Sequence, residues 1–347
     1  MSRTYLDWNA TAPLRPEARA AMIAAMDVVG NPSSVHAEGR AAKMIVETAR
    51  AQVAEATGAM DADVVFTSGA TEAAALALSG RELAATAVEH DCVGAWVAED
   101  LAVDRNGIAT VPDSANSALQ LANSETGVMQ SLPQGLAFTD AVQAVGKVPF
   151  AFSWSGAQMA AISGHKFGGP KGIGALILRQ GIDIPSQMRG GGQEMGRRAG
   201  TENVIAIAGI GAAAAAAAAD LDAGRMQEVA ELRNILEDTL RQGCPDLILL
   251  GQGAERLPNT TCIAVPGWRG ETQVMQMDLA GYAISAGSAC SSGKVKASKV
   301  IRAMGYDEDI ASSTIRISIG ATTTQAEIRG FAAAWLRQFE KFRARAA

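Results

Sequence analysis

A lysine surrounded by glycines is the strongest chemical signal in this sequence. Lys166 lies in the segment SGHKFGGPKG (163–172), directly after an apolar run over residues 158–162. A lysine at the end of a buried strand, beside a hydroxyl and an imidazole, can lose its proton and form a Schiff base. The segment is equally compatible with an ordinary loop lysine in a flexible turn. Most of the other lysines are interpreted as solvated surface charges.

Two further patterns could serve a bound cofactor. Asp140 and Gln143 lie in a segment that could end a strand, where a carboxylate could pair with a pyridinium nitrogen and an amide could hold a phenolic oxygen. The segment SGAT (68–71) lies at a strand-to-helix junction, where backbone N–H groups and the helix dipole favour phosphate. The alternative for this junction is a helix simply capped by Thr71.

One cysteine has the surroundings of a reactive thiol. Cys290 lies among small residues in SAGSACSSG (285–293), and lysines follow at 294, 296 and 299. Flexibility, exposure and nearby cations favour a thiolate. The other cysteines, Cys92, Cys244 and Cys262, have more apolar neighbours and are interpreted as structural. Since none shows CxxC spacing, we expect neither a zinc site nor disulfides, and the chain is placed in a reducing cytoplasm.

Composition narrows the class of protein. With 347 residues, 48% of them hydrophobic, and a net charge of −6, the chain can bury a large core, and neither disorder nor nucleic-acid binding is supported. The motifs GxGxxG, GxxxxGK[ST], HExxH and GxSxG are absent from the sequence. The stretch 204–219 is Ala/Gly-dominated and short for a membrane span, so we expect a buried helix there and no membrane partner.

The elements that must position these residues follow from the hydrophobic pattern. Short apolar runs alternate with helical patterns through the first two thirds of the chain, which indicates an α/β fold with a mostly parallel sheet. The runs expected as strands cover residues 64–67, 84–88, 108–112, 119–122, 158–162 and 173–178. Helical patterns follow over 202–242 and 324–343, with a domain change near 220–224.

Taken together, the segments resemble the cysteine desulfurases, in particular the NifS/IscS branch, within the class V aminotransferase family. The matching segments are YLDWNATAP (5–13), GNPSSVHAEG (30–39), FTSGATE (66–72), EH (89–90), NSETG (123–127), DAVQ (140–143), SGHK (163–166), RAGT (198–201), SAGSAC (285–290) and STIR (313–316). The resemblance implies the pyridoxal-phosphate (PLP) transferase fold type I, with a seven-stranded type of sheet. It also implies a large domain over 14–222 and a small α+β domain, formed by 1–13 and 223–347, that carries Cys290 and Arg316.

The resemblance also implies roles for individual residues. Lys166 would bind PLP as a Schiff base, Asp140 would keep the ring nitrogen protonated, and Gln143 would hold the phenolic oxygen. His90 would stack on the ring and transfer protons. The residues implied for the phosphate are Ala70, Thr71, Ser163 and His165, with Thr201 contributed by the neighbouring subunit of a homodimer. Those implied for the substrate are Asn9, Asn123, Ser124 and Arg316, and Ser124 would also contact the cofactor.

The activity implied is removal of sulfur from L-cysteine, giving L-alanine and a persulfide on Cys290 for a sulfur-acceptor protein, for example in iron-sulfur cluster synthesis. This chain departs from the family at Ser124, where a second asparagine is usual, and in shorter intervals over 71–90, 90–124 and 125–140. It therefore resembles a shortened member. Two alternatives remain: a selenocysteine lyase or other class V PLP enzyme, and a degenerate PLP-binding regulatory homologue.

Overall fold

The computed structural model describes residues 3–287 and 297–346. Its α-helices are α1 (Pro16–Met26), α2 (Ala37–Ala56), α3 (Ala70–Leu78), α4 (Asp91–Gly94), α5 (Val204–Asp222), α6 (Arg225–Gly243), α7 (Gly270–Leu279), α8 (Lys299–Ala303), α9 (Glu308–Ser312) and α10 (Gln325–Ala346). Its strands are β1 (Thr4–Tyr5), β2 (Ala62–Thr67), β3 (Ala84–Thr86), β4 (Ala98–Leu101), β5 (Thr139–Asp140), β6 (Met159–Ser163), β7 (Gly174–Arg179), β8 (Ile248–Leu249), β9 (Thr260–Ala264), β10 (Tyr282–Ala283), β11 (Ser285–Ala286) and β12 (Thr314–Ser318).

The larger sheet contains the expected catalytic segments. Strands β2, β7, β6 and β5 are neighbours in that order, and parallel bridges at Ala118–Phe138 and Ser117–Ala84 continue the sheet to β3 and β4. Within this stretch, all of which the structure describes, β7 alone runs antiparallel to its neighbours. The order β4, β3, 117–118, β5, β6, β7, β2 agrees with the expected mostly parallel, seven-stranded type of sheet, and the α/β fold class is confirmed.

Most of the expected strands form, with two exceptions. The apolar runs at 64–67, 84–88, 158–162 and 173–178 become β2, β3, β6 and β7, with β3 limited to Ala84–Thr86. The run at 108–112 forms only a single bridge, from Ala109 to Val103, and the run at 119–122 only one, from Ala122 to Met129. The second run does lie beside β5, since Leu119 and Leu121 donate backbone hydrogen bonds to the carbonyls of Phe138 and Asp140, but neither run forms a continuous ladder.

The connections between β3 and β5 carry few helices. Across this stretch, which the structure describes in full, the helical elements are α4 and a 3-10 turn at Ser114–Asn116. Parallel strands are usually joined by longer crossover helices. Trp96 and Ile108 are correspondingly part-exposed, at 40% and 38%. The shortened intervals of the sequence therefore coincide with trimmed connections.

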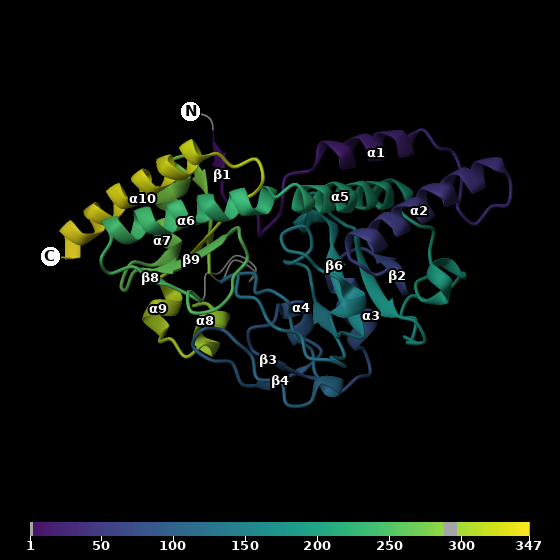
Figure 1. Ribbon diagram of the computed structural model, residues 1–347, viewed down its shortest axis with the longest axis horizontal. Helices are drawn as coiled ribbons and strands as arrows, with labels where there is room; N and C mark the ends of the chain where they lie inside the picture. The colour runs from purple at the N-terminus through teal and green to yellow at the C-terminus, as the bar shows by residue number, and fades with distance from the viewer. Residues whose placement is uncertain (1–2, 288–296, 347) are drawn as a thin grey trace.

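Helix α5 lies in the core on one face of the larger sheet, packed along α1 and α2 (Figure 1). Close approach to α2 depends on Gly211, because a Cβ there would lie 2.6 Å from the Cα of Ala49. By length and composition α5 is the one helix of the described residues that could cross a membrane, contrary to the sequence estimate. Half of its most apolar window is nevertheless buried inside the protein.

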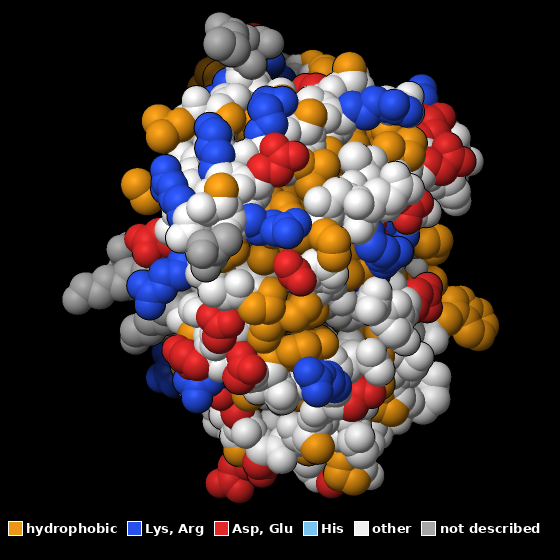
Figure 2. All heavy atoms as spheres, turned by 90° about the vertical axis from the view of Figure 1, so that its left-hand side faces the viewer, with side chains coloured by type: hydrophobic (Ala, Val, Ile, Leu, Met, Phe, Trp, Pro, Cys, Tyr) orange, Lys and Arg blue, Asp and Glu red, His pale blue; other side chains and the backbone are white. Residues whose placement is uncertain are grey.

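A second sheet, in the order β11, β12, β9, β8, lies at the other end of the molecule, under α6, α7 and α10 (Figure 1). Its core contains Trp335 and Phe339, whose rings stack, and Trp268 against both. Figure 2 shows this end of the molecule, where Lys and Arg side chains and Asp and Glu side chains both occur in the upper and in the lower half. The described residues of this face thus carry both charge signs.

The amino-terminal segment connects the two groups of elements. Strand β1 pairs with β10, and Asp7 continues the pairing with a parallel bridge to Ser318 in β12. One core cluster contains Leu6 with residues 226–339, whereas another is confined to residues 18–217. The division into 14–222 and 1–13 with 223–347 stays a prediction. It matches the break between α5 and α6, where Gly224 adopts a positive φ of 76°.

Candidate active site

A cavity of about 590 Å³ collects most of the predicted site residues. That volume is within the usual range for cofactor and small-molecule sites. The predicted residues that line it are Asn9, Ala70, Thr71, His90, Ser124, Asp140, Gln143, Ser163, His165, Lys166 and Arg316. They come from both sheets, from the amino-terminal segment and from the turns that follow β2, β5 and β6. The structure therefore brings together residues that are as far apart in the chain as Asn9 and Arg316.

One end of the cavity suits an anion. Helix α3 begins there at Ala70, and its N-cap residue Gly69 supplies no side-chain acceptor, so first-turn N–H groups face the cavity end without a cap. Strand β7 comes close to this turn because position 174 is glycine: a Cβ there would lie 2.8 Å from the Cα of Gly69. Burial, with Lys166 adding to the effect, lowers the pKa of His165 to about 4, so its imidazole is neutral at pH 7.

Lys166 is among the residues that line the cavity. It follows β6 in the short turn Gly164–Lys166, as the sequence predicted, and is half-buried. Its Nζ donates to the backbone carbonyls of Asn9 at 2.7 Å and Ala10 at 3.0 Å. The amino-terminal segment therefore holds the lysine amine in place within the site.

The cavity also contains a buried carboxylate. Asp140 ends β5, and its Oδ1 accepts from the backbone N–H of Val142 at 2.9 Å. Burial raises the pKa of Asp140, while His90 and Lys166 act in the opposite direction. His90 is the N-cap of α4, and its Nδ1 accepts from the backbone N–H of Cys92 at 3.2 Å. A neutral His90 therefore carries its proton on Nε2.

Cys92, interpreted from the sequence as structural, lies at the candidate active site. It lines the cavity, and its Sγ lies 3.0 Å from Nδ1 of His90. The other two cysteines that the structure describes, Cys244 and Cys262, are buried, and burial raises the pKa of both thiols. The apolar neighbours of Cys92 in sequence did not reveal that α4 turns its thiol toward His90.

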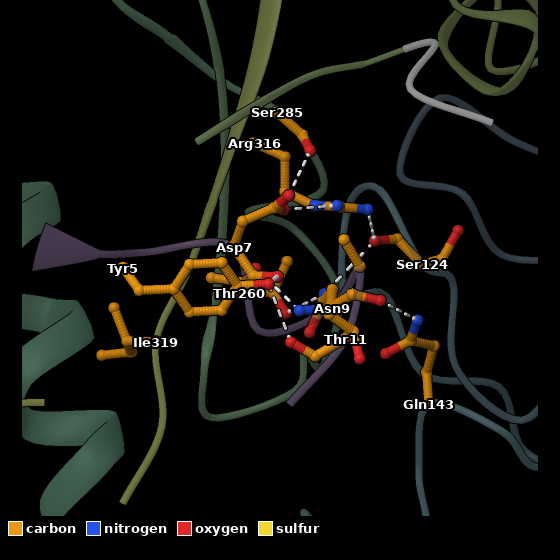
Figure 3. A network of polar contacts seen from close by, with 12 residues as sticks. Tyr5, Asp7, Asn9, Thr11, Ser124, Gln143, Thr260, Ser285, Arg316 and Ile319 are labelled. Atoms are coloured by element: carbon orange, nitrogen blue, oxygen red, sulfur yellow. Dashed lines mark hydrogen bonds and ion pairs between the residues drawn. The ribbon is translucent and has the colours of Figure 1, made fainter. Parts of the chain in front are cut away.

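Arg316 is held by a polar network at the edge of the cavity (Figure 3). The side chain is 3% exposed, and its Nη2 donates to Asp7 Oδ1 at 2.8 Å. The second oxygen of Asp7 accepts from the hydroxyl of Ser285 at 2.8 Å. Since Ser285 lies opposite Arg316 in the β11–β12 ladder, both donors approach Asp7 from one side. The Nε of Arg316 has no partner among the described residues, which leaves a buried donor available to an anion.

Ser124 contacts the network through its backbone. Its carbonyl accepts from Nη1 of Arg316 at 2.9 Å and from Nδ2 of Asn9 at 3.2 Å. Asn123, expected to bind substrate, does not line the cavity: its Oδ1 accepts from the N–H groups of Glu125 and Thr126, both at 2.9 Å. We therefore assign Asn123 to the turn that presents Ser124, rather than to the substrate.

Thr201 and Cys290 are the remaining predicted site residues. Thr201 is exposed and does not line the cavity, although its neighbours Gly200 and Glu202 line a small adjoining cavity that shares Ser68. Cys290 lies outside the described residues. The roles predicted for both stay predictions.

Sequence reasoning also missed contributors. Asp7 lies within the matched segment 5–13, but its acidic side chain was given no role. Lys147, grouped with surface lysines, is 6% exposed beside Gln143 and Asn9. Its position four residues after Gln143 was the available signal. Among the described residues, no group of three His, Cys, Asp or Glu side chains could hold a metal.

The donor set fits pyridoxal phosphate. Helix N–H groups of α3 and Ser163 can bind the phosphate, Asp140 can face the ring nitrogen, and Lys166 lines the same cavity. Fold and site together define a PLP-dependent transferase of fold type I. The chain belongs to the class V aminotransferases: the family description "Aminotransferase class-V" matches residues 4–331, and this family is PLP-dependent.

The curated proteins described next are both named cysteine desulfurases. This chain is 40% identical to "Cysteine desulfurase" of Cereibacter sphaeroides, over 94% of this chain and 93% of that protein. It is 35% identical to "Cysteine desulfurase IscS" of Dictyoglomus turgidum, over 93% and 91% of the two chains. A solved NifS-like protein from Rickettsia africae superposes with a TM-score of 0.88 at 30% identity, over 97% and 99%. The predicted resemblance is thereby confirmed. The first alignment spans 367 residues, longer than this chain, so this chain lacks segments present in its relative.

The side chain of Glu89, the residue before His90, is a buried carboxyl group. It is 3% exposed, its Oε1 accepts from the N–H of Gln120 at 2.7 Å, and its Oε2 has no partner among the described residues. Burial raises the pKa of Glu89 to about 8. The side chain is therefore protonated at neutral pH.

This burial predicts a pH-dependent stability. Folded Glu89 keeps its proton up to about pH 8, whereas an unfolded glutamate loses it near pH 4.5, so the folded state binds more protons in between. Stability therefore falls as the pH rises through that window. E89Q keeps the acceptor for Gln120 but cannot ionise. We expect its melting temperature to fall less than that of the wild type between about pH 6 and about pH 9.

Thermal unfolding at several pH values measures this difference. E228Q, a change at an exposed glutamate paired with Arg225, is the matched control and should keep the wild-type pH dependence. An E89Q protein whose melting temperature falls as steeply as that of the wild type would show that Glu89 is already ionised in the folded state.

Proposed function

We propose that this protein is a cysteine desulfurase, which converts L-cysteine to L-alanine and retains the sulfur as a persulfide on Cys290. The observation that carries the proposal is that Lys166, the first turn of α3, the buried Asp140 and Arg316 all line one cavity. The names of the relatives support the same activity.

Pyridoxal phosphate, when bound, supplies an electron sink that lowers the cost of removing the α-proton of an amino acid. Ala70, Thr71, Ser163 and His165 would hold its phosphate. Asp140 would keep its ring nitrogen protonated, and Gln143 would donate to its phenolic oxygen. A neutral His165 suits this position, because it can donate a hydrogen bond without adding charge beside Lys166.

The protein's own groups then handle the substrate. Arg316 binds the carboxylate of cysteine, and the network of Asp7 and Ser124 fixes the direction of its guanidinium. Lys166 would hold the cofactor through its amine, and the same amine, when free, would take the α-proton of the substrate. His90 carries its proton on Nε2 and so can donate it within the cavity.

Sulfur transfer needs the thiol of Cys290. Its thiolate attacks the sulfur of the substrate; an S–S bond forms, the C–S bond breaks, and the carbon takes the electron pair and then a proton. Cysteine and one thiol thus yield alanine and one persulfide without an added oxidant or reductant. A sulfur-acceptor protein would then collect the persulfide sulfur, with iron-sulfur clusters as a destination.

Anaerobic incubation with L-cysteine tests this function. We expect alanine formation, the absorbance of bound pyridoxal phosphate, and a persulfide mapped to Cys290 by mass spectrometry. K166A should lose alanine formation, whereas C290A should keep cofactor absorbance and lose transferable sulfur. A C244A variant, which removes a buried thiol, is the control for the second change. Persulfide on another cysteine, or full sulfur delivery by C290A, would refute the assignment.

The Asp7 network predicts an effect on substrate affinity. D7N keeps the shape of the side chain but replaces a charged acceptor of Arg316 with a neutral amide. We expect KM for L-cysteine to rise about tenfold or more, since hydrogen bonds between charged groups contribute about 1.5–3 kcal/mol, with a smaller change in kcat.

Steady-state kinetics measure this change. The control D278N alters an exposed aspartate paired with Arg3 at the surface and should leave KM unchanged. If D7N shows the wild-type KM, Asp7 does not orient the carboxylate-binding group.

We also propose that the active unit is a homodimer in which Thr201 reaches the phosphate of the partner. The preceding turn is strained, with φ of 48° at Glu194 and 58° at Met195, and the buried pair of Glu194 with Arg50 holds it. Apolar side chains are exposed on or near α1 and α2: Ile23, Met26, Val29, Val35 and Met44. Such a surface is typical of an interface.

Mixing two inactive variants tests the shared site. T201A and K166A subunits in one dimer would restore one complete site, with Lys166 from one chain and Thr201 from the other. We expect activity at limiting PLP to reappear on subunit exchange, and light scattering to give the mass of two chains. A monomeric mass, or dimers that exchange without recovering activity, would exclude a shared site.

A further inference from the structure

Lys147 is a buried lysine in the part of the chain that the structure describes, and the proposed function gives it no task. It is 6% exposed and follows β5 by a short turn. Its Nζ donates to Oδ1 of Asn9 at 3.0 Å and, through a short hydrogen bond, to Oε1 of Gln143. Both acceptors belong to amides that line the candidate active site.

These contacts decide which way the amide of Gln143 faces. Its Nε2 donates to the backbone carbonyl of Asn9 at 3.1 Å, and a carbonyl can only accept. The nitrogen therefore points to that side, and Oε1 points to Lys147. One of the two N–H bonds of Nε2 is left for another acceptor.

The amide of Asn9 is fixed in the same way. Its Oδ1 accepts from Lys147 and from Nδ2 of Asn259, at 3.0 Å each. Its Nδ2 donates to the carbonyl of Ser124 and to the hydroxyl of Thr260. Without a donor at Lys147, the oxygen of Gln143 loses its partner in a buried place, and only the carbonyl of Asn9 still holds the amide in its orientation.

We propose that Lys147 is a positioning residue that orients the amide of Gln143 so that its N–H, and not its oxygen, faces the phenolic oxygen of bound pyridoxal phosphate. This inference rests on the proposed function, because it assumes that the cavity binds this cofactor. The short hydrogen bond to Oε1 and the carbonyl of Asn9 on the other side of the amide are the observations that carry it.

Burial leaves Lys147 the donors that this task needs. Burial lowers the pKa of Lys147 well below its usual value, and Lys166 and Arg316 act in the same direction. With or without its charge, the amine has at least two N–H bonds, one for each amide oxygen. The positioning role therefore rests on the geometry and does not depend on the charge of Lys147.

The cavity beside Lys147 decides which substitution tests its role. Lys147 and Lys166 also line a second cavity of about 410 Å³, next to Gly146 and Asn259. Water from this cavity could replace the amine if the side chain were shortened. Methionine fills the same space without donating, so K147M is the informative change.

The test measures binding of pyridoxal phosphate to apoprotein. We expect K147M to weaken binding about 10- to 100-fold, the range for a buried polar group left unpaired. We also expect it to shift the absorbance maximum of the bound cofactor in the same direction as Q143A. In the double variant Q143A/K147M the loss should be smaller than the product of the two single losses, because both changes remove the same contact.

The control K341M, at an exposed lysine of α10, should bind as the wild type does. If K147M is not recovered folded, K147Q is measured against the same criterion. Unchanged affinity and absorbance in K147M would overturn the proposal, and so would single losses that multiply in the double variant. Failure of the wild-type protein to bind pyridoxal phosphate would instead reject the proposed function.

Discussion

The insertion of the amino-terminal segment between the two sheets is the constraint on which the site depends. The N–H of Trp8 donates to the carbonyl of Ser318 on one side, and the N–H of Ala12 donates to that of His165 on the other. Between these bonds, the carbonyls of Asn9 and Ala10 receive the amine of Lys166. A few residues thus hold both groups of elements and the reactive lysine in one arrangement.

Burial of polar groups explains why that arrangement is specific. In a low-dielectric interior each donor and acceptor needs a partner, and an unpaired group costs about 1–3 kcal/mol. The side chain of Asn9 is paired by hydrogen bonds to Ser124, Thr260 and Asn259. The guanidinium of Arg316 is paired with the carboxylate of Asp7. Displacing the segment would break most of these bonds together.

Family and fold could be predicted because they depend on local patterns. Glycines and hydroxyl residues next to apolar runs predicted the turns after β2 and β6. In the structure these turns bring the start of α3 and Lys166 to one cavity. The runs at 108–112 and 119–122 form only isolated bridges, because a continuous ladder depends on how the neighbouring segments approach and not on hydrophobicity alone. The shortened intervals indicated trimmed connections, which the structure contains between β3 and β5.

The sequence by itself determined which chemical groups are present and the order in which they follow one another, and therefore the family and the residues that can act on an amino acid. Only the tertiary structure decided which side chains are buried and which way their polar atoms point. In the folded protein Lys147 is a buried hydrogen-bond donor, the thiol of Cys92 lies beside His90, and the side chain of Asn123 hydrogen-bonds within its own turn. The physical reason is that hydrogen-bond partners and desolvation come from residues far apart in the chain, whose approach no local pattern encodes.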